Sequence, residues 1–325
     1  MTRSMPRREL LKQAAVAATL GLTAGSAEAR LKKDQKSVSN DPAALPIIDT
    51  HQHLWDLTKF HLSWLDGAPS LNHSYLTKDY LEATKGLNVV RAVYMEVDVD
   101  PEQQVKEAEY VIGLCHDKNT PTAAGVISGR PGLPGFRDYI KRFHTAPEIK
   151  GIRQVLHGPG TPKGYCLEPN FVKDIQFLGE QGMSYDLCMR SPELRDGTRL
   201  IDQCPGTRFI LDHCGNPNVQ STDLSQWKRD LAELAERPNV VGKVSGILAS
   251  AKPNAWTVAD IAPIVNHMLD SFGPDRVIFA GDWPVCTLGG TFKTWTEGVR
   301  EIVKTRSPQV QRNLFHDNAV RFYGL

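Results

Sequence analysis

Short apolar runs rich in β-branched residues alternate with longer amphipathic segments along residues 46–325. The short runs have the length and composition of strands that are buried in a parallel sheet. These predicted strands cover residues 47–54, 89–98, 122–129, 149–156, 184–189, 208–215, 240–246 and 277–284. The longer segments have the apolar spacing of helices that cover a sheet. The clearest predicted helices cover residues 102–118, 170–181, 224–237, 258–272 and 294–304.

Eight strand-then-helix units are the number that a closed parallel barrel requires. A doubly wound open sheet is the alternative, and such a sheet usually carries a glycine-rich phosphate loop after its first strand. Here that place is taken by His51-Gln52-His53. The pattern therefore predicts an α/β fold, a single-domain (β/α)8 TIM barrel over residues 46–325.

The first 29 residues resemble a twin-arginine export signal. Residues 6–12 (PRRELLK) are basic, an uncharged apolar segment follows, and Ala27-Glu28-Ala29 has the small-x-small pattern of a cleavage site. An amphipathic first helix is the alternative. We expect a signal peptide at residues 1–29, a linker at 30–45 and a periplasmic or secreted protein.

Composition narrows the class of protein further. Hydrophobic residues make up 41% of the chain and charged residues 23%, as in a globular enzyme. The net charge of +1 gives no electrostatic case for nucleic acid, and no segment after the signal is apolar enough to span a membrane. A small molecule is the expected partner, and the oligomeric state cannot be read from the sequence. The six cysteines have no metal-binding spacing and are expected to be mostly buried small hydrophobic side chains.

Polar residues gather at the carboxyl ends of the predicted strands, where the active site of a barrel enzyme lies. A barrel interior favours branched apolar side chains, so charged groups in these positions need a reason. The residues concerned are His51, His53, Glu96, Arg153, Tyr185, His213, Lys243 and Asp282.

His51 and His53 are two residues apart on a strand, so their side chains point to the same face. They can converge on one metal ion or on one substrate group, or each can be hydrogen-bonded separately. His213 at the end of strand six and Asp282 at the end of strand eight extend the set. A buried carboxylate at Asp282 can ligate a metal and can also take a proton from an attacking water.

Five motifs at these strand ends resemble those of the amidohydrolase-2 family. They are DTHQHLWD at 49–56, GIRQ at 151–154, LDHCGNP at 211–217, KVSG at 243–246 and GDWP at 281–284. Within the family they look most like the branch of sugar-acid and dicarboxylate lactonases. The closing residues 318–325 also look like the family's C-terminal helix, so the resemblance covers residues 46–325.

The resemblance implies a TIM-barrel hydrolase that opens a cyclic ester, the lactone of a sugar acid or of a related carboxylic acid. The family's catalytic residues fall on His51, His53, His213 and Asp282. In the implied mechanism Asp282 deprotonates water, while His213 and either a metal or the two strand-one histidines polarise the carbonyl.

Substrate contacts are expected from several other residues. Arg153 and Lys243 are candidates to hold a carboxylate or ring hydroxyls, with salt bridges that brace the loops as the alternative. His61 and Trp64 fall in a segment that resembles the lactonase branch's pocket loop. We expect the remaining pocket contacts from two aromatic residues at the strand ends, Tyr185 and Trp283.

One departure from the family pattern concerns the metal. Many metal-dependent members carry a histidine at the end of strand five, where this chain has Tyr185-Asp186-Leu187-Cys188. The sequence therefore leaves two alternatives: zinc or manganese held by His51, His53, His213 and Asp282, or a site that works without a metal. Glu96 is the nearest substitute for the missing histidine ligand.

Two other functions are open at this point: a metal-dependent decarboxylase of aromatic acids and a non-catalytic exported protein that binds sugar acids. The missing histidine counts against the first and the buried base against the second.

Overall fold

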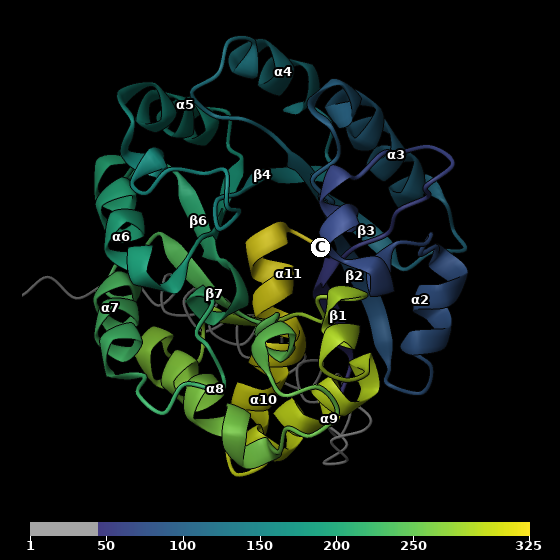
Figure 1. The fold of residues 1–325 in the computed structure, drawn as a ribbon, viewed down its shortest axis with the longest axis vertical. Helices are drawn as coiled ribbons and strands as arrows, with labels where there is room; N and C mark the ends of the chain where they lie inside the picture. Colours follow the sequence, from purple (N-terminus) through teal and green to yellow (C-terminus); the bar gives the residue numbers. More distant parts are fainter. Residues whose placement is uncertain (1–44) are drawn as a thin grey trace, which may run out of the picture. The chain divides into compact units, whose positions relative to one another are not determined.

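The computed structural model describes residues 45–325, which form a nearly closed barrel of eight parallel strands ringed by helices (Figure 1). The predicted signal peptide at 1–29 and all of the predicted linker except Leu45 lie outside the described residues. The strands are β1 (Ile47–Gln52), β2 (Val89–Met95), β3 (Thr122–Ser128), β4 (Ile149–Val155), β5 (Ser184–Cys188), β6 (Arg208–Leu211), β7 (Val240–Val244) and β8 (Val277–Phe279). Each lies within its predicted range, so the α/β barrel prediction is confirmed.

Helices follow the strands, and all of them except α11 lie outside the ring of strands (Figure 1). They are α2 (Thr77–Ala83), α3 (Gln104–His116), α4 (Phe136–Phe143), α5 (Pro169–Glu180), α6 (Leu194–Gln203), α7 (Ser225–Ala235), α8 (Val258–Phe272), α9 (Phe292–Val303), α10 (Pro308–Arg312) and α11 (Asn318–Tyr323). None of the helices in the described part of the chain has the length and apolar character needed to cross a membrane.

Neighbouring strands pair in parallel in the order β1 to β8, and β1 also contacts the segment after β8. Gln52 forms a parallel bridge with Trp283, and the backbone N–H of His53 donates to the carbonyl of Trp283 at 2.8 Å. These contacts join the first and last strands at the carboxyl end of the barrel, where the predicted site residues lie.

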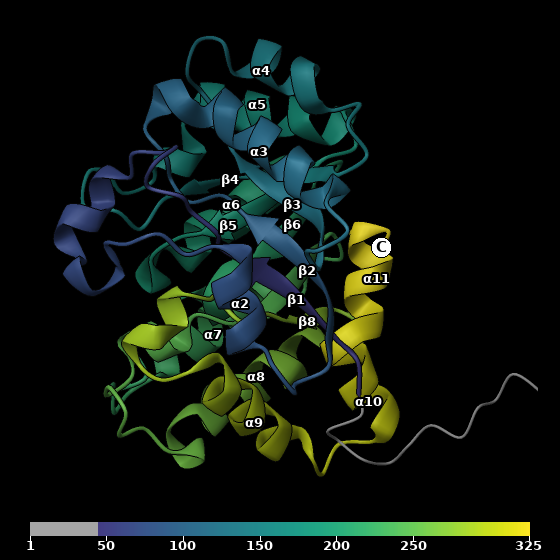
Figure 2. The same ribbon diagram turned by 90° about the vertical axis from the view of Figure 1, so that its right-hand side faces the viewer.

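The core has two layers. Ile48, Val93 and Ile278 belong to a cluster inside the barrel, whereas a larger cluster fills the space between strands and helices. Ala319 and Tyr323 of α11 join the inner cluster. Figure 1 shows α11 in the middle of the ring of strands, and Figure 2 shows it at one end of the barrel, so this last helix forms the barrel floor.

Two strand ends differ from the sequence prediction. The predicted sixth strand continues to residue 215, but β6 ends at Leu211 and Asp212–Gly215 form a 3₁₀ helix with His213 at φ 53°. The predicted eighth strand continues to residue 284, but Asp282 has φ 55°. Left-handed backbone cannot continue a strand, so both residues turn out of the sheet.

In β1 the register shifts between Asp49 and Gln52. Ile48 and His51 are three residues apart and would point to opposite faces of a regular strand. Both nevertheless face the barrel interior, because the irregularity turns His51 inward.

All six cysteines are free, and five of them are buried, as expected.

Candidate active site

The structure brings the four predicted central residues together at the carboxyl end of the barrel. His51 and His53 come from the end of β1, His213 from the turn after β6 and Asp282 from the turn after β8, and all four are buried. Asp282 Oδ1 lies 3.6 Å from His51 Nε2 and 3.5 Å from His53 Nε2. The rings of His51 and His213 have centroids 4.5 Å apart. One carboxylate and three imidazoles therefore share one buried space.

The position of His213 depends on two residues directly after β7, Ser245 and Gly246. Its Nδ1 lies 3.0 Å from Ser245 Oγ, which leaves Nε2 to face the site. Gly246 lies directly behind the ring: a Cβ at this residue would come within 2.1 Å of His213 Nδ1. Gly246 also has φ +68°, a conformation that favours glycine. The KVSG motif thus supplies both a hydrogen-bond partner and the space that His213 needs.

The left-handed backbone at His213 and Asp282 is strained, because non-glycine residues in this region cost about 1–3 kcal/mol each. Such strain persists only where the surrounding structure fixes it, and it occurs often at functional sites. Around Asp282, the backbone N–H of Cys286 donates to the Asp282 carbonyl at 2.7 Å. The Trp283–Pro284 peptide that follows is cis.

Asp49 is a residue whose role sequence reasoning missed. Its side chain is completely buried and accepts hydrogen bonds from Gly281 N at 2.7 Å, Tyr80 Oη at 2.8 Å and His51 N at 3.1 Å. One carboxylate therefore connects the backbone next to Asp282 with the backbone of His51. The sequence signal for this role was the position of Asp49 in the motif, two residues before His51. The role itself could not be predicted, because the partners Tyr80 and Gly281 lie on distant segments.

Arg153 and Glu96 form a buried pair. Arg153 Nε donates to Glu96 Oε1 at 2.6 Å, and Nη2 donates to the Glu96 carbonyl at 2.8 Å. The second carboxylate oxygen, Oε2, accepts from the backbone N–H of Asp98 at 2.7 Å. Both oxygens of Glu96 are thus engaged, so the structure does not place Glu96 as the substitute metal ligand that the sequence suggested. The remaining nitrogen, Arg153 Nη1, lies 3.2 Å from His51 Nε2 and faces the site.

Lys243 lies deeper, between Asp186 of β5 and Asp212. Its Nζ is 2.9 Å from Asp186 Oδ2, 2.9 Å from Asp212 Oδ1 and 3.3 Å from His51 Nδ1. Lys243 has no exposed surface. It therefore does not brace a surface loop but belongs to an internal charge network, and the contact between Lys243 and a substrate stays a prediction. Asp186 and Asp212 were visible as strand-end carboxylates, but only the closed barrel shows that both meet Lys243.

Burial controls the protonation of the site. Burial lowers the pKa of His213 to about 4 and that of His53 to about 3, so both imidazoles are neutral at neutral pH. Burial also raises the pKa of Asp282, although His213 and Arg153 counteract the rise. For Asp212 burial acts to raise the pKa, but Lys243 and His51 outweigh it and hold that pKa well below its ordinary value. Neutral imidazoles can bind a metal or donate one hydrogen bond.

Three of the residues that were expected to contact the substrate lie in the loops after β1 and β8. Trp64 is half-buried, and its Nε1 donates to the carbonyl of Val97 at 2.8 Å, while the buried Trp283 packs edge-to-face on Tyr75. His61 is exposed, with Nδ1 2.6 Å from Asp100 Oδ2. These three residues build the loops after β1 and β8.

Tyr185 does not face the site. It packs between Phe171 of α5 and Phe209 of β6 in the outer core. Neighbouring residues on a strand point to opposite faces, so Asp186 occupies the inner face instead.

A metal ion fits the donor set. His51, His53 and Asp282 place one ligand atom each within 4.8 Å of one another. His53 Nδ1 lies 3.0 Å from the carbonyl of Met95, so Nδ1 carries the proton and Nε2 presents a lone pair to the Asp282 carboxylate. Two acceptors that face each other favour a cation or a proton between them. Three protein ligands with an open fourth position are typical of catalytic zinc. Arg153 Nη1, close to His51 Nε2, would have to withdraw.

A cavity of about 630 Å³ opens beside this centre, over the loops that follow β4 to β7. Its lining includes His157, Arg190, Trp227 and Gly246. Because Gly246 also lies directly behind the His213 ring, one wall of the cavity adjoins the predicted central residues.

The fold and the site together define the class of protein. A family model described as amidohydrolase matches residues 48–325, so this chain belongs to the amidohydrolase family, and the family prediction is confirmed.

Two proteins of similar sequence and one solved structure are similar to this chain over most of its length. An uncharacterized protein of Sinorhizobium fredii is 32% identical over 301 residues, which cover 86% of this chain and 98% of that protein. The L-fucono-1,5-lactonase of Burkholderia multivorans is 25% identical over 290 residues, or 86% of this chain and 96% of the relative. The crystal structure of an amidohydrolase from Burkholderia multivorans with bound zinc has a TM-score of 0.77 at 24% identity, covering 86% and 99% of the two chains.

Proposed function

We propose that the protein hydrolyses lactones of sugar acids or of related carboxylic acids. The observation that carries the proposal is the Asp282 carboxylate, which is buried beside neutral imidazoles at the open end of the barrel. This arrangement suits a base that activates water next to a polarised carbonyl. The lactonase name of the Burkholderia multivorans relative supports the substrate class.

In the proposed reaction Asp282 takes a proton from a water molecule, and the water oxygen attacks the lactone carbonyl carbon. His213 Nε2 faces the site because Nδ1 is engaged with Ser245, so an N–H at Nε2 can donate to the developing oxyanion. The bond from the carbonyl carbon to the ring oxygen then breaks, and the proton held by Asp282 passes to that oxygen. The product is the open hydroxy acid, and Asp282 is again a carboxylate.

Arg153 is the residue best placed to orient the substrate. Two of its nitrogens are held by Glu96, which fixes the guanidinium plane, and Nη1 remains directed at the site. A fixed guanidinium binds a carboxylate or two hydroxyls with defined geometry. A divalent ion at His51, His53 and Asp282 would, when bound, polarise the carbonyl and lower the pKa of a water molecule.

The test is acid release from a panel of sugar-acid 1,4- and 1,5-lactones, followed with a pH indicator. Some 1,5-lactones open without an enzyme, so the Asp282→Asn variant at equal concentration provides the background. We expect wild-type acid release well above this background for at least one lactone. If no lactone shows a difference, the proposal fails. Carbon dioxide release from aromatic acids in the same panel would instead favour the decarboxylase alternative.

We also propose that the enzyme acts outside the cytoplasm, because residues 6–12 and 27–29 have the pattern of a twin-arginine export signal.

A further inference from the structure

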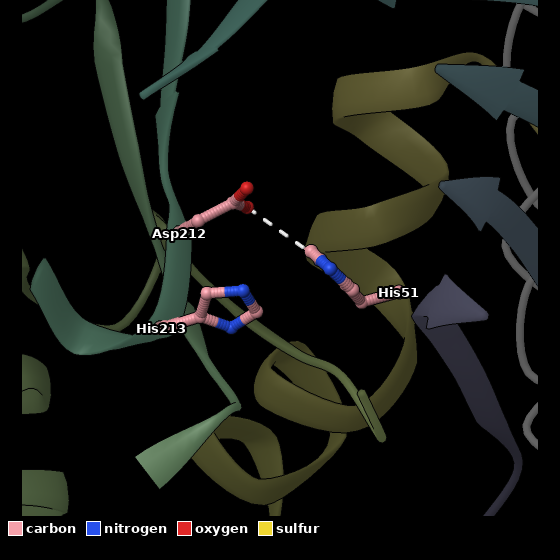
Figure 3. A group of neighbouring side chains, drawn as sticks. All are labelled: His51, Asp212 and His213. Atoms are coloured by element: carbon pink, nitrogen blue, oxygen red, sulfur yellow. Dashed lines mark ion pairs between the residues drawn. The ribbon is translucent and has the colours of Figure 1, made fainter. Parts of the chain in front are cut away.

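His51 belongs to two groups of side chains that could each hold a cation. His51, His53 and Asp282 form one group, and His51, Asp212 and His213 form the other. The groups use opposite nitrogens of the same ring: Nε2 lies 3.6 Å from Asp282 Oδ1, and Nδ1 lies 3.6 Å from Asp212 Oδ1. Figure 3 shows the second group, in which the dashed line joins Asp212 to His51 while His213 lies beside them.

The space on the Nδ1 side already contains a positive charge. Lys243 Nζ lies 3.3 Å from His51 Nδ1 and 2.9 Å from Asp212 Oδ1. A second carboxylate, that of Asp186, approaches the same ammonium group at 2.9 Å, and all of these side chains are buried. An imidazole nitrogen and two carboxylate oxygens around one point are ligands that would suit a divalent metal ion.

The carboxylates retain capacity to bind a cation. Asp186 Oδ1 and Asp212 Oδ2 are buried, and within residues 45–325 neither accepts a hydrogen bond. A buried oxygen without a partner is costly, and an ion that contacts several ligands at once would reduce that cost. Arg153 Nη1 lies 3.8 Å from Asp212 Oδ2, beyond hydrogen-bond distance, so the surroundings of Lys243 have more free acceptors than one ammonium group uses.

We propose that the Lys243 ammonium group is a built-in cation that occupies the second cation position of this centre. The centre therefore accepts at most one divalent ion, on the His51 Nε2 side, with His53 and Asp282. Lys243 acts as a positioning residue: its ammonium group holds the Asp212 carboxylate against the Nδ1 side of the His51 ring, where the ring N–H faces that carboxylate, so that the Nε2 lone pair remains directed toward the Asp282 side. This inference does not depend on the identity of the substrate.

Metal content tests the proposal directly. Wild type and Lys243→Ala are stripped with a chelator, loaded with Zn²⁺ or Co²⁺, desalted and analysed by plasma mass spectrometry. We expect Lys243→Ala to bind one more ion per chain than wild type, because an ion can enter the space left by the ammonium group. Lys243→Arg is the matched control, since it keeps a cation there and should bind as many ions as wild type.

Two further measurements locate the additional ion. Asp212→Asn in the Lys243→Ala background removes a ligand and should abolish the extra ion. Propylammonium, which matches the lost part of the lysine side chain, should compete with the metal in Lys243→Ala and leave wild type unaffected. Co²⁺ absorption spectra report both effects without any assay of activity.

Removal of a buried cation can prevent folding because two carboxylates are left unpaired. Lys243→Ala/Asp186→Asn keeps His51, Asp212 and His213 and preserves the net charge, so it replaces the single variant if that variant is insoluble. Equal metal content in the folded variant and in wild type would overturn the proposal. Uptake of two ions at this centre by wild type would also overturn it. Neither result bears on lactone hydrolysis, which is measured separately.

Discussion

Asp49 of β1 accepts a hydrogen bond from the backbone N–H of Gly281, 2.7 Å away and immediately before Asp282. The same carboxylate accepts the backbone N–H of His51 at 3.1 Å. One buried side chain thereby fixes the first strand and the segment after the last strand relative to each other. The distance between the proposed base and the histidine pair depends on this contact.

Replacement of Asp49 should affect stability and catalysis together. Asp49→Ala leaves the N–H of Gly281 without its buried partner, which typically costs about 1–3 kcal/mol in the free energy of unfolding. We expect kcat to fall as well, because the segment with Asp282 can move away from His53. Urea unfolding and steady-state kinetics measure the two effects. Tyr80→Phe removes one of the three hydrogen bonds and should have a smaller effect on both; an equal or larger effect would contradict this role of Asp49.

Asp282→Asn tests the proposed base. The amide is nearly isosteric but cannot accept the proton from water, so kcat should fall by about 10²–10⁴-fold. The melting temperature should stay close to that of wild type, since the turn is held by backbone contacts. The kcat and the melting temperature are measured on the same preparation. If the variant melts normally and retains most of its kcat, Asp282 is not the base.

Gly246→Ala should displace His213. The new Cβ would lie within 2.1 Å of the His213 Nδ1 atom, so the ring must move, and we expect kcat to fall by at least tenfold. Gly182→Ala is the matched control, because Gly182 also has a positive φ of +73° but has nothing within 4 Å of its Cβ position. Both variants carry backbone strain of about 1–2 kcal/mol. Similar kcat losses in the two variants would mean that strain, not displacement of His213, is responsible.

The stability of chelator-treated protein should decrease in mild acid. Burial lowers the pKa of His213 to about 4 and that of His53 to about 3, whereas imidazoles in the unfolded chain titrate near 6.5. Below about 6.5 the unfolded state therefore binds more protons than the native state. The free energy of unfolding falls as the pH decreases toward 4, by about 1.4 kcal/mol per pH unit for each group.

Urea unfolding of wild type and His213→Gln at pH 7 and pH 5 measures this dependence. The variant lacks one of the three buried imidazoles of the site and should lose less stability between the two pH values. An identical loss in both proteins would exclude His213 as a source of the acid sensitivity.

Arg7 and Arg8 carry the export proposal. Their joint replacement by lysine keeps the charge but removes the arginine pair that the twin-arginine pathway requires. We expect the double variant to accumulate in the cytoplasm as the uncleaved precursor, as seen by fractionation and mass spectrometry. Undiminished periplasmic recovery of the double variant would refute the proposal. A single Lys12→Arg change, outside the pair, serves as the control.

The barrel and its central residues were predictable because the carboxyl ends of parallel strands meet at one end of a closed barrel. His51, His53, His213 and Asp282 each follow a recognisable strand, so chain order alone brings them together. The left-handed turns at His213 and Asp282 were not predictable from apolar runs, because the same apolar residues suit either a strand or a turn in that position.

The charge network around Lys243 could not be predicted from the sequence for a different reason. Lys243 and Asp186 are far apart in the chain, and only closure of the barrel shows that they meet. Glu96 had the chemistry of a ligand, but Arg153 and the backbone N–H of Asp98 each engage one of its carboxylate oxygens. Tyr185 was predicted to face the pocket, but it lies one position before Asp186 on β5. A shift of one residue along a strand moves a side chain to the other face.

The floor of the barrel is made by α11. Ala319 and Tyr323 of α11 share the inner cluster with Ile48 and Ile278. Without α11 the apolar side chains of this inner cluster would be open to water, so the eight strands cannot form a sealed core before residues 318–323 have docked. Sealing the core therefore requires contacts between segments separated by most of the domain's sequence, and such long-range contacts form slowly in folding.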